Sequence, residues 1–364
     1  MRGSWSSLIL LCLLWFAPVV VAQPDVPDRL HPRQVFVLRN VDGVGTNRLI
    51  FLDLLTGEQQ AVDLYGERYT VTPDGVLFYA PGENRVRVVT PDGDVRDHPF
   101  VQPRGTTRRV DWLLDSDAQS IVWTLTEGVP GVLTTVTQIA NYDGSDRRDV
   151  LTDGPRDGIR AMPVAFSADR SELYMDYQPD TIGDYTTFRQ YAGLFAVDLD
   201  SGSTRALPGE PGCFCGAGLG SDWFLRLALT NNLSGFDLQA RQLERGIEQT
   251  IPSLPLADYT QGGDILISPD GLYAIYALAQ VRNFGTPDQE VQSVLVLVDL
   301  NALTQAPLGE VVDFLLRPTA WTEADNAVLL TSPQIDGTWK ITLPDGDLQR
   351  IADATYLGEI NVSP

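Results

Sequence analysis

Short apolar runs alternate with polar turns along most of this chain. The runs are rich in Val, Leu, Ile, Phe and Tyr, and the turns between them carry Pro-Asp-Gly or Thr-Gly sequences that favour β-turns. No long stretch shows the helical apolar period between caps that a layer of helices requires. The pattern predicts an all-β protein and leaves sandwiches, barrels and propellers as candidate folds.

The turns recur in two kinds, and their spacing favours one of these folds. The first kind joins one apolar run to the next, at residues 71–75, 114–117, 166–169, 220–222, 267–271 and 321–325. The second kind lies later in each unit, at residues 53–58, 91–94, 142–146, 198–202, 237–240, 299–302 and 344–347. Turns of one kind lie about 40 to 60 residues apart, which is the length of a four-stranded propeller blade. We predict a β-propeller of about seven blades, with six or eight as alternatives.

The last residues repeat an internal segment, and this repeat predicts how the ring closes. Residues 358–364 (GEINVSP) match residues 263–269 (GDILISP), where the innermost strand of the sixth blade is expected. At the other end, residues 34–39, 48–54 and 59–64 supply only three strands for the first blade. We therefore expect the C-terminal strand to complete the first blade, which leaves no long exposed strand edge.

These repeats resemble a known family. The apolar strand followed by Ser-Pro-Asp-Gly, and the later Asp-Leu-x-Thr-Gly turn, are similar to the repeats of TolB-like β-propellers, which are related to WD-type repeats. The sharpest matches lie at residues 72–75 and 268–271, and the resemblance covers residues 34–364. It implies one propeller domain over this range, but no particular activity, because such propellers occur in peptidases, hydrolases and interaction proteins.

The N-terminal segment predicts export. Residues 1–22 (MRGSWSSLILLCLLWFAPVVVA) hold an early arginine, an apolar run and a small-residue ending, which is typical of a secretory signal peptide. Pro18 interrupts the run, which is short for a membrane span, so we expect cleavage and no remaining transmembrane span, with a retained anchor as the alternative. Residues 23–33 are rich in proline and predict a linker. The mature protein is then secreted, periplasmic or at the cell surface.

Charge and composition argue against several classes of function. The chain has 26 Lys and Arg against 48 Asp and Glu, a net charge of −22, so we expect no nucleic-acid partner. Only two histidines occur, His31 and His98, and no Gly-x-Ser-x-Gly, HExxH or P-loop motif is present, which argues against triad and zinc hydrolases. Cys213 and Cys215 leave three states open: thiols, a local disulfide, or a metal or redox pair. We expect no cofactor, with a divalent cation as the alternative.

Strand alternation predicts which face binds a partner. If the strands of a blade are lettered a to d from the axis outwards, the a–b and c–d turns share one face and the b–c and d–a connections share the other. The tight turns fall on the first, or tight-turn, face. The second, or long-loop, face carries residues 40–47, 99–107, 178–192, 207–216, 252–262 and 280–292. Long loops on a rigid scaffold are usual binding elements. Within them, Tyr185, Phe188, Arg189 and Tyr191 suit a protein, peptide or glycan contact, with a self-packed insertion as the alternative.

Four charged residues occupy equivalent places near the start of inner strands. They are Arg68, Asp111, Asp264 and Glu359, each four residues before a turn serine, threonine or its substitute. They are expected to lie at the mouth of the channel on the long-loop face. Converging carboxylates there would suit a cation or a basic ligand, and the alternative is ordinary ion pairing between blades, with Arg68 offsetting Glu359.

These observations favour a non-catalytic, monomeric binding or scaffold protein outside the cytoplasm, whose long-loop face binds a protein, peptide or glycan. The alternative is a propeller hydrolase or lactonase-like enzyme that uses carboxylates at the channel mouth or a bound cation.

Overall fold

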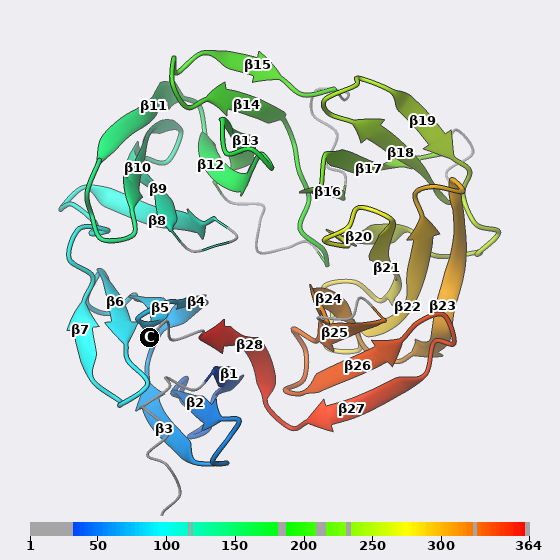
Figure 1. Ribbon diagram of the computed structural model, residues 1–364, viewed down its shortest axis with the longest axis horizontal. Helices are drawn as coiled ribbons and strands as arrows, with labels where there is room; N and C mark the ends of the chain where they lie inside the picture. Colours follow the sequence, from blue (N-terminus) through cyan, green and yellow to red (C-terminus); the bar gives the residue numbers. More distant parts are fainter. Residues whose placement is uncertain are drawn as a thin grey trace, which may run out of the picture.

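The computed structural model describes residues 32–115, 117, 119–180, 187–208, 216–230, 234–322 and 326–360. Within these ranges all regular elements are strands, and they form seven four-stranded antiparallel sheets. Figure 1 shows the sheets arranged around a central axis, with one strand of each sheet innermost. The prediction of a seven-bladed β-propeller is confirmed.

The four strands of each blade follow one another from the axis to the rim. Blade 1 contains β28 (Thr355–Ile360), β1 (Arg33–Leu38), β2 (Asn47–Asp53) and β3 (Gln59–Leu64), and blade 2 contains β4 (Glu67–Thr72), β5 (Gly75–Ala80), β6 (Arg85–Val89) and β7 (Val95–Asp97). Blade 3 contains β8 (Thr107–Leu114), β9 (Ser120–Val129), β10 (Val132–Asn141) and β11 (Arg148–Arg156), and blade 4 contains β12 (Ile159–Phe166), β13 (Glu172–Pro179), β14 (Leu194–Asp198) and β15 (Thr204–Ala206). Blade 5 contains β16 (Ala217–Gly220), β17 (Trp223–Leu229), β18 (Phe236–Gln242) and β19 (Glu248–Ile251). Blade 6 contains β20 (Gln261–Ile267), β21 (Tyr273–Arg282), β22 (Glu290–Asp299) and β23 (Thr304–Val312), and blade 7 contains β24 (Arg317–Trp321), β25 (Ala327–Thr331), β26 (Thr338–Thr342) and β27 (Leu348–Ala352).

The ring closes through blade 1, as the terminal repeat predicted. The last strand, β28, pairs antiparallel with the first, β1, and places Gln34 opposite Glu359. Figure 1 shows red β28 beside blue β1 and next to blade 2. The strand begins at Thr355, three residues before the repeated segment.

Blade 1 is also fastened to blade 7 by a polar contact. Arg39 follows β1 and donates from Nε to Oδ1 of Asp336 at 2.6 Å, and its backbone N–H donates to Oδ2 at 2.9 Å. The same guanidinium donates to the carbonyls of Ser332 and Pro333, each at 2.9 Å. The Arg39 side chain therefore donates to three acceptors in the b–c loop of blade 7.

Apolar side chains pack between neighbouring blades. In blade 6, strand β22 is nearly continuous in apolar residues because both of its faces are covered. Val294, Val296 and Val298 pack toward blade 5, whereas Val291 and Leu295 pack toward blade 7. The period of two along this strand therefore supplies both neighbouring interfaces.

The two faces have the connections that strand alternation predicted, with one correction. The loop expected over residues 280–292 is confined to residues 283–289, because β21 and β22 remain paired as far as Arg282 opposite Glu290. In blade 5, a tight turn still joins β16 to β17 although Pro-Asp-Gly is missing: Ser221 and Asp222 have φ of 46° and 65°, the left-handed values of a two-residue hairpin turn.

Several predicted features lie outside the described residues. These are the signal peptide at residues 1–22, most of the linker at residues 23–33, Tyr185, Cys213 and Cys215. Across the described ranges, no helix combines the length and apolar character that crossing a membrane would require.

Candidate functional site

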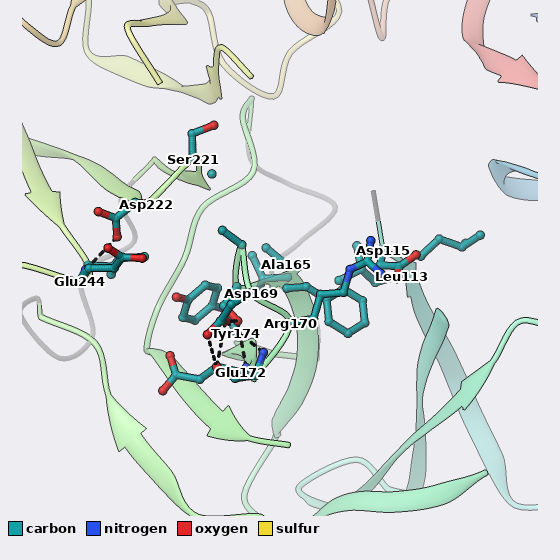
Figure 2. A pocket seen from close by; sticks show the side chains of 18 of the residues that line it. Leu113, Asp115, Ala165, Asp169, Arg170, Glu172, Tyr174, Ser221, Asp222 and Glu244 are labelled. Carbon is teal, nitrogen blue, oxygen red and sulfur yellow. Dashed lines mark hydrogen bonds and ion pairs between the residues drawn. The ribbon is translucent and has the colours of Figure 1, made fainter. Parts of the chain in front are cut away.

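A pocket of about 780 Å³ opens at the tight-turn face. It is lined by the ends of the inner strands of blades 3, 4 and 5, by the turn after β12, and by the turn that contains Ser221 and Asp222. Figure 2 shows these side chains around the space, with Asp222 and Glu244 on one side and Asp115 and Arg170 on the other. Loop length predicted a binding site on the opposite face, so this pocket was not found from the sequence.

Blade 5 packs unevenly against its two neighbours, and this explains where the pocket lies. A Cβ atom on Gly218 of β16 would lie 2.7 Å from the carbonyl oxygen of Ile265, and a Cβ on Gly216 would lie 2.7 Å from that of Gly262. Glycine thus lets blade 5 approach blade 6 closely. On its other side, the buried cluster shared with blade 4 holds only Tyr174, Ala196 and Leu207 among the described residues.

The pocket carries more negative than positive side chains. Its lining includes five carboxylates, Asp115, Asp169, Glu172, Asp222 and Glu244, and two arginines, Arg170 and Arg205. This excess of acids favours a positively charged ligand in a space partly shielded from water.

Three ion pairs engage the two arginines: Arg205 pairs with Glu172, and Arg170 pairs with both Asp115 and Asp117. Arg205 donates to Glu172 through Nε at 2.9 Å and Nη2 at 2.5 Å, which is a bidentate pair. Arg170 lies 3.4 Å from Oδ2 of Asp115, a carboxylate that is 5% exposed. Within the described part of the chain, the three other carboxylates of the pocket have no arginine partner of their own.

These other carboxylates are positioned by the turns that carry them. Asp169 accepts hydrogen bonds from the hydroxyls of Ser167 at 2.7 Å and Ser171 at 2.9 Å, and these bonds lower its pKa. Asp222 accepts from the backbone N–H of Glu244 at 2.8 Å, which ties the two tight turns of blade 5 together. Asp169 consequently remains an anion in ordinary conditions.

Tyr174 supplies a polar side chain to the lining of the pocket. The residue is 3% exposed, and its ring packs between blades 4 and 5. Its hydroxyl makes no hydrogen bond with any residue in the described ranges, although the residue lines the pocket. Burial, reinforced by the charge of Glu172, raises the pKa of Tyr174 to about 12. The hydroxyl therefore keeps its proton and can donate to a ligand or accept from one.

The structure pairs the predicted channel-mouth residues instead of gathering them. Arg68 lies 3.1 Å from Asp111 of the neighbouring blade, so the predicted offset of Glu359 by Arg68 is wrong. Asp264 lies 3.0 Å from Arg317, and Glu359 lies in β28 opposite Gln34. In the described part of the chain, no three His, Cys, Asp or Glu side chains are grouped so that they could hold a metal ion.

The segment of residues 187–193 lies across the long-loop end of the inner strands. Phe188 is fully buried and packs on Gly263 of blade 6, while the carbonyl of Thr187 accepts from Arg317 of blade 7 at 2.5 Å. Figure 1 shows this segment reaching from β14 toward β20 and β24. Phe188 is thus a packing residue, whereas Arg189 is exposed and lies over the ring of Tyr191 at 5.2 Å.

The sequence does carry one signal near the pocket, a departure from the repeat, which loop length alone did not use. The first-kind turns of blades 3 and 5 match the Pro-Asp-Gly pattern least, and both border the pocket through Asp115 and Ser221.

Solved structures with the same fold differ widely in sequence. A prolyl endopeptidase matches 89% of this chain over 50% of its own length, with a TM-score of 0.59 and 11% identity. An oligogalacturonate lyase in complex with manganese matches 89% of this chain and 90% of its own, with a TM-score of 0.54 and 12% identity. TolB from Acinetobacter baumannii matches 78% of this chain and 66% of its own, with a TM-score of 0.42 and 13% identity. For the endopeptidase and the lyase, the likeness at such identities shows the fold alone. No family model matches the chain, and no curated protein matches it in sequence.

Proposed function

We propose that this chain is an exported, non-catalytic binding propeller that takes a basic group of a partner polypeptide into the acidic pocket. The observation that carries the proposal is the pocket of about 780 Å³ lined by five carboxylates and two arginines, with Tyr174 also in its lining. Export rests on the signal-like pattern of residues 1–22.

The pocket suits the side chain of a lysine or an arginine. Both arginines of the pocket already have carboxylate partners, so an entering cation meets Asp169, Asp222 and Glu244. Hydrogen bonds between an ionised donor and a carboxylate are about twice as strong as neutral ones. The hydroxyl of Tyr174 adds a hydrogen-bond acceptor to which no described residue donates.

The proposal changes the face that loop length indicated. The long-loop end of blades 6 and 7 is covered by residues 187–193, which bury Phe188. The tight-turn end retains open space beside charged side chains. We therefore place the partner contact at the tight turns.

A carboxylate-based hydrolase is supported less well by this geometry. Such an enzyme needs one carboxyl that holds a proton near a second that is ionised. In the pocket, hydrogen bonds lower the pKa of Asp169, and Glu172 is engaged by Arg205 in a bidentate pair. These arrangements suit attraction of a cation better than donation of a proton.

Fluorescence anisotropy with a labelled peptide tests the proposal. The probe is a fluorescein-labelled glycine hexapeptide with two arginines, and its counterpart carries two glutamates instead. The double variant Asp222→Asn, Glu244→Gln is expected to bind the arginine peptide about tenfold more weakly than the unaltered protein, because each lost carboxylate removes a charge-assisted contact. Tyr174→Phe is expected to weaken binding about threefold.

A matched control removes the same charge elsewhere on the same face. Asp345 and Asp347 are exposed residues on a tight turn of blade 7, so Asp345→Asn, Asp347→Asn changes the net charge equally. This control is expected to bind within about twofold of the unaltered protein. Equal losses in both double variants, equal binding of the arginine and glutamate peptides, or no binding of the arginine peptide would each refute the proposal.

A further inference from the structure

A second cluster of charges lies at the long-loop end of the inner strands of blades 2, 3 and 4. Asp111 of β8 is 9% exposed and lies among Arg68 of β4, Arg109 of β8 and Arg160 of β12. Its Oδ1 is 3.1 Å from Nη1 of Arg68 and 3.7 Å from Nε of Arg109, and its Oδ2 accepts a hydrogen bond from Nη1 of Arg160. Three guanidinium groups therefore share one carboxylate.

The neighbouring pair does not change this balance. Arg108 donates to Asp180 at 2.9 Å, which adds one positive and one negative charge. Asp111 and Asp180 are the two acids whose charges raise the pKa of Arg160. The cluster thus keeps an excess of two positive charges, in a chain whose net charge is −22.

The N–H donors of these three arginines outnumber the acceptors that the chain places around them. Each guanidinium offers five N–H groups. Arg160 is 4% exposed and its Nε has no acceptor, and the buried Nε of Arg109 has none either. The side chain of Arg109 makes no hydrogen bond to any residue that the structure describes. Buried donors without acceptors are unfavourable, so an acceptor from outside the chain would stabilise this arrangement.

We propose that Arg68, Arg109 and Arg160 form a binding site for an oxyanion, namely a carboxylate or phosphate group of a ligand. Arg68 and Arg109 expose 26% and 27% of their side chains, so an anion reaches them from solvent, while buried Arg160 lies behind. The planar fork of arginine fits either group through two parallel hydrogen bonds. Burial lowers the pKa of Arg160, and the charges of Arg109 and Arg68 lower it further, which an added anion would oppose.

This inference goes beyond the proposed function. The site lies on the opposite face of the ring and takes a ligand of opposite charge. A failure of the acidic pocket to bind arginine peptides therefore leaves the oxyanion site untouched, and the reverse also holds.

Isothermal titration calorimetry at low ionic strength tests the site with two probes, inorganic phosphate and succinate. The full chain is expected to bind at least one probe, and the comparison of the two tells a phosphate ligand from a carboxylate ligand. Arg109→Gln and Arg68→Gln are each expected to weaken that binding about tenfold, and Arg109→Lys to weaken it nearly as much, because lysine keeps the charge but loses the fork. The control Arg48→Gln removes an exposed arginine paired with Asp63 on blade 1 and is expected to bind as the unaltered protein does.

Three results of these titrations would overturn the proposed oxyanion site. Arg68 and Arg109 are partly exposed, so their variants are expected to fold, and circular dichroism checks this before titration. Absence of binding of both probes to the unaltered protein overturns the proposal. So does binding that all three substitutions at Arg68 and Arg109 leave unchanged, or that Arg48→Gln weakens to the same extent.

Discussion

Lowering the pH from 7.5 to 4.5 is expected to destabilise the fold through His98. This side chain follows β7 and is 3% exposed. Its Nδ1 accepts a hydrogen bond from the backbone N–H of Val101 at 3.0 Å, and its ring lies 4.6 Å from that of Phe100. Burial, with a smaller contribution from Arg96, lowers the pKa of His98 from 6.5 to about 4. Protonation would therefore cost a hydrogen bond and place a charge in an apolar site.

The sign and size of the effect follow from proton linkage. The unfolded chain binds a proton at this histidine near pH 6.5, whereas the folded chain does so only near pH 4. The stability contributed by the neutral imidazole is therefore complete above pH 6.5 and is lost as the pH falls toward 4. At pH 4.5 the two pKa values correspond to a loss of about 2.5 kcal/mol in the free energy of unfolding.

Urea unfolding followed by tryptophan fluorescence measures this loss in the unaltered protein and in His98→Asn. The Asn amide oxygen can accept from Val101 in place of Nδ1 but does not titrate. Carboxylates titrate in both proteins, so the difference between the two pH dependences isolates His98. The unaltered protein is expected to lose about 2.5 kcal/mol more than the variant between pH 7.5 and 4.5. Parallel pH dependences would refute the assignment of a neutral, buried imidazole.

Three further changes probe the parts that hold the ring together. Asp111→Asn removes the counter-charge of buried Arg160 and is expected to lower the free energy of unfolding by about 3 to 5 kcal/mol, measured with urea. Arg39→Ala breaks the contact between blades 1 and 7 and is expected to speed hydrogen exchange of the β28 amides while β5 keeps its protection. Phe188→Ala removes a fully buried ring and is expected to hasten protease cleavage near residue 188, as the crossing segment loses packing of about 3 to 5 kcal/mol.

Each of these changes has an outcome that contradicts its reasoning. Asp63→Asn removes an exposed partner of Arg48, and a loss as large as that of Asp111→Asn would show that burial is not the cause. Uniform acceleration of exchange after Arg39→Ala would point to global destabilisation instead of a local opening. Unchanged cleavage after Phe188→Ala would mean that Phe188 does not hold its segment.

Local sequence rules accounted for the fold because each blade depends on its own turns. Pro-Asp-Gly at residues 73–75 presets a tight turn between two strands, and alternation in β22 fixes which side chains face each neighbouring blade. The repeated segment at residues 358–364 placed β28 beside β1, since it matched an inner strand already assigned. Turn residues, strand alternation and the three N-terminal strands of the first blade were therefore sufficient to predict the fold.

The candidate sites depend on contacts between residues that are far apart in the sequence, and local sequence patterns do not predict such contacts. Arg68 can extend toward either neighbouring blade, and only the position of Asp111 decides which. Phe188 belongs to a polar-looking loop, and its burial follows from the path of that loop toward blades 6 and 7. The glycine at position 218 carries no local signal of its role, yet it lets blade 5 approach blade 6 closely, while the pocket lies on the other side of blade 5, beside Tyr174.

The pairing of β28 with β1 dictates the order in which the molecule can assemble. Blade 1 has its three N-terminal strands early in synthesis, but its fourth strand arrives only with residues 355–360. The other six blades are contiguous in sequence and can form in turn, whereas the first waits for almost the entire chain. Because closure entropy grows slowly with loop length, this late step is a matter of timing more than of equilibrium. A circular permutant in which residue 360 is joined to residue 32 through a short linker, with new ends opened in an exposed loop between two blades, would make every blade local and should reach the native state sooner.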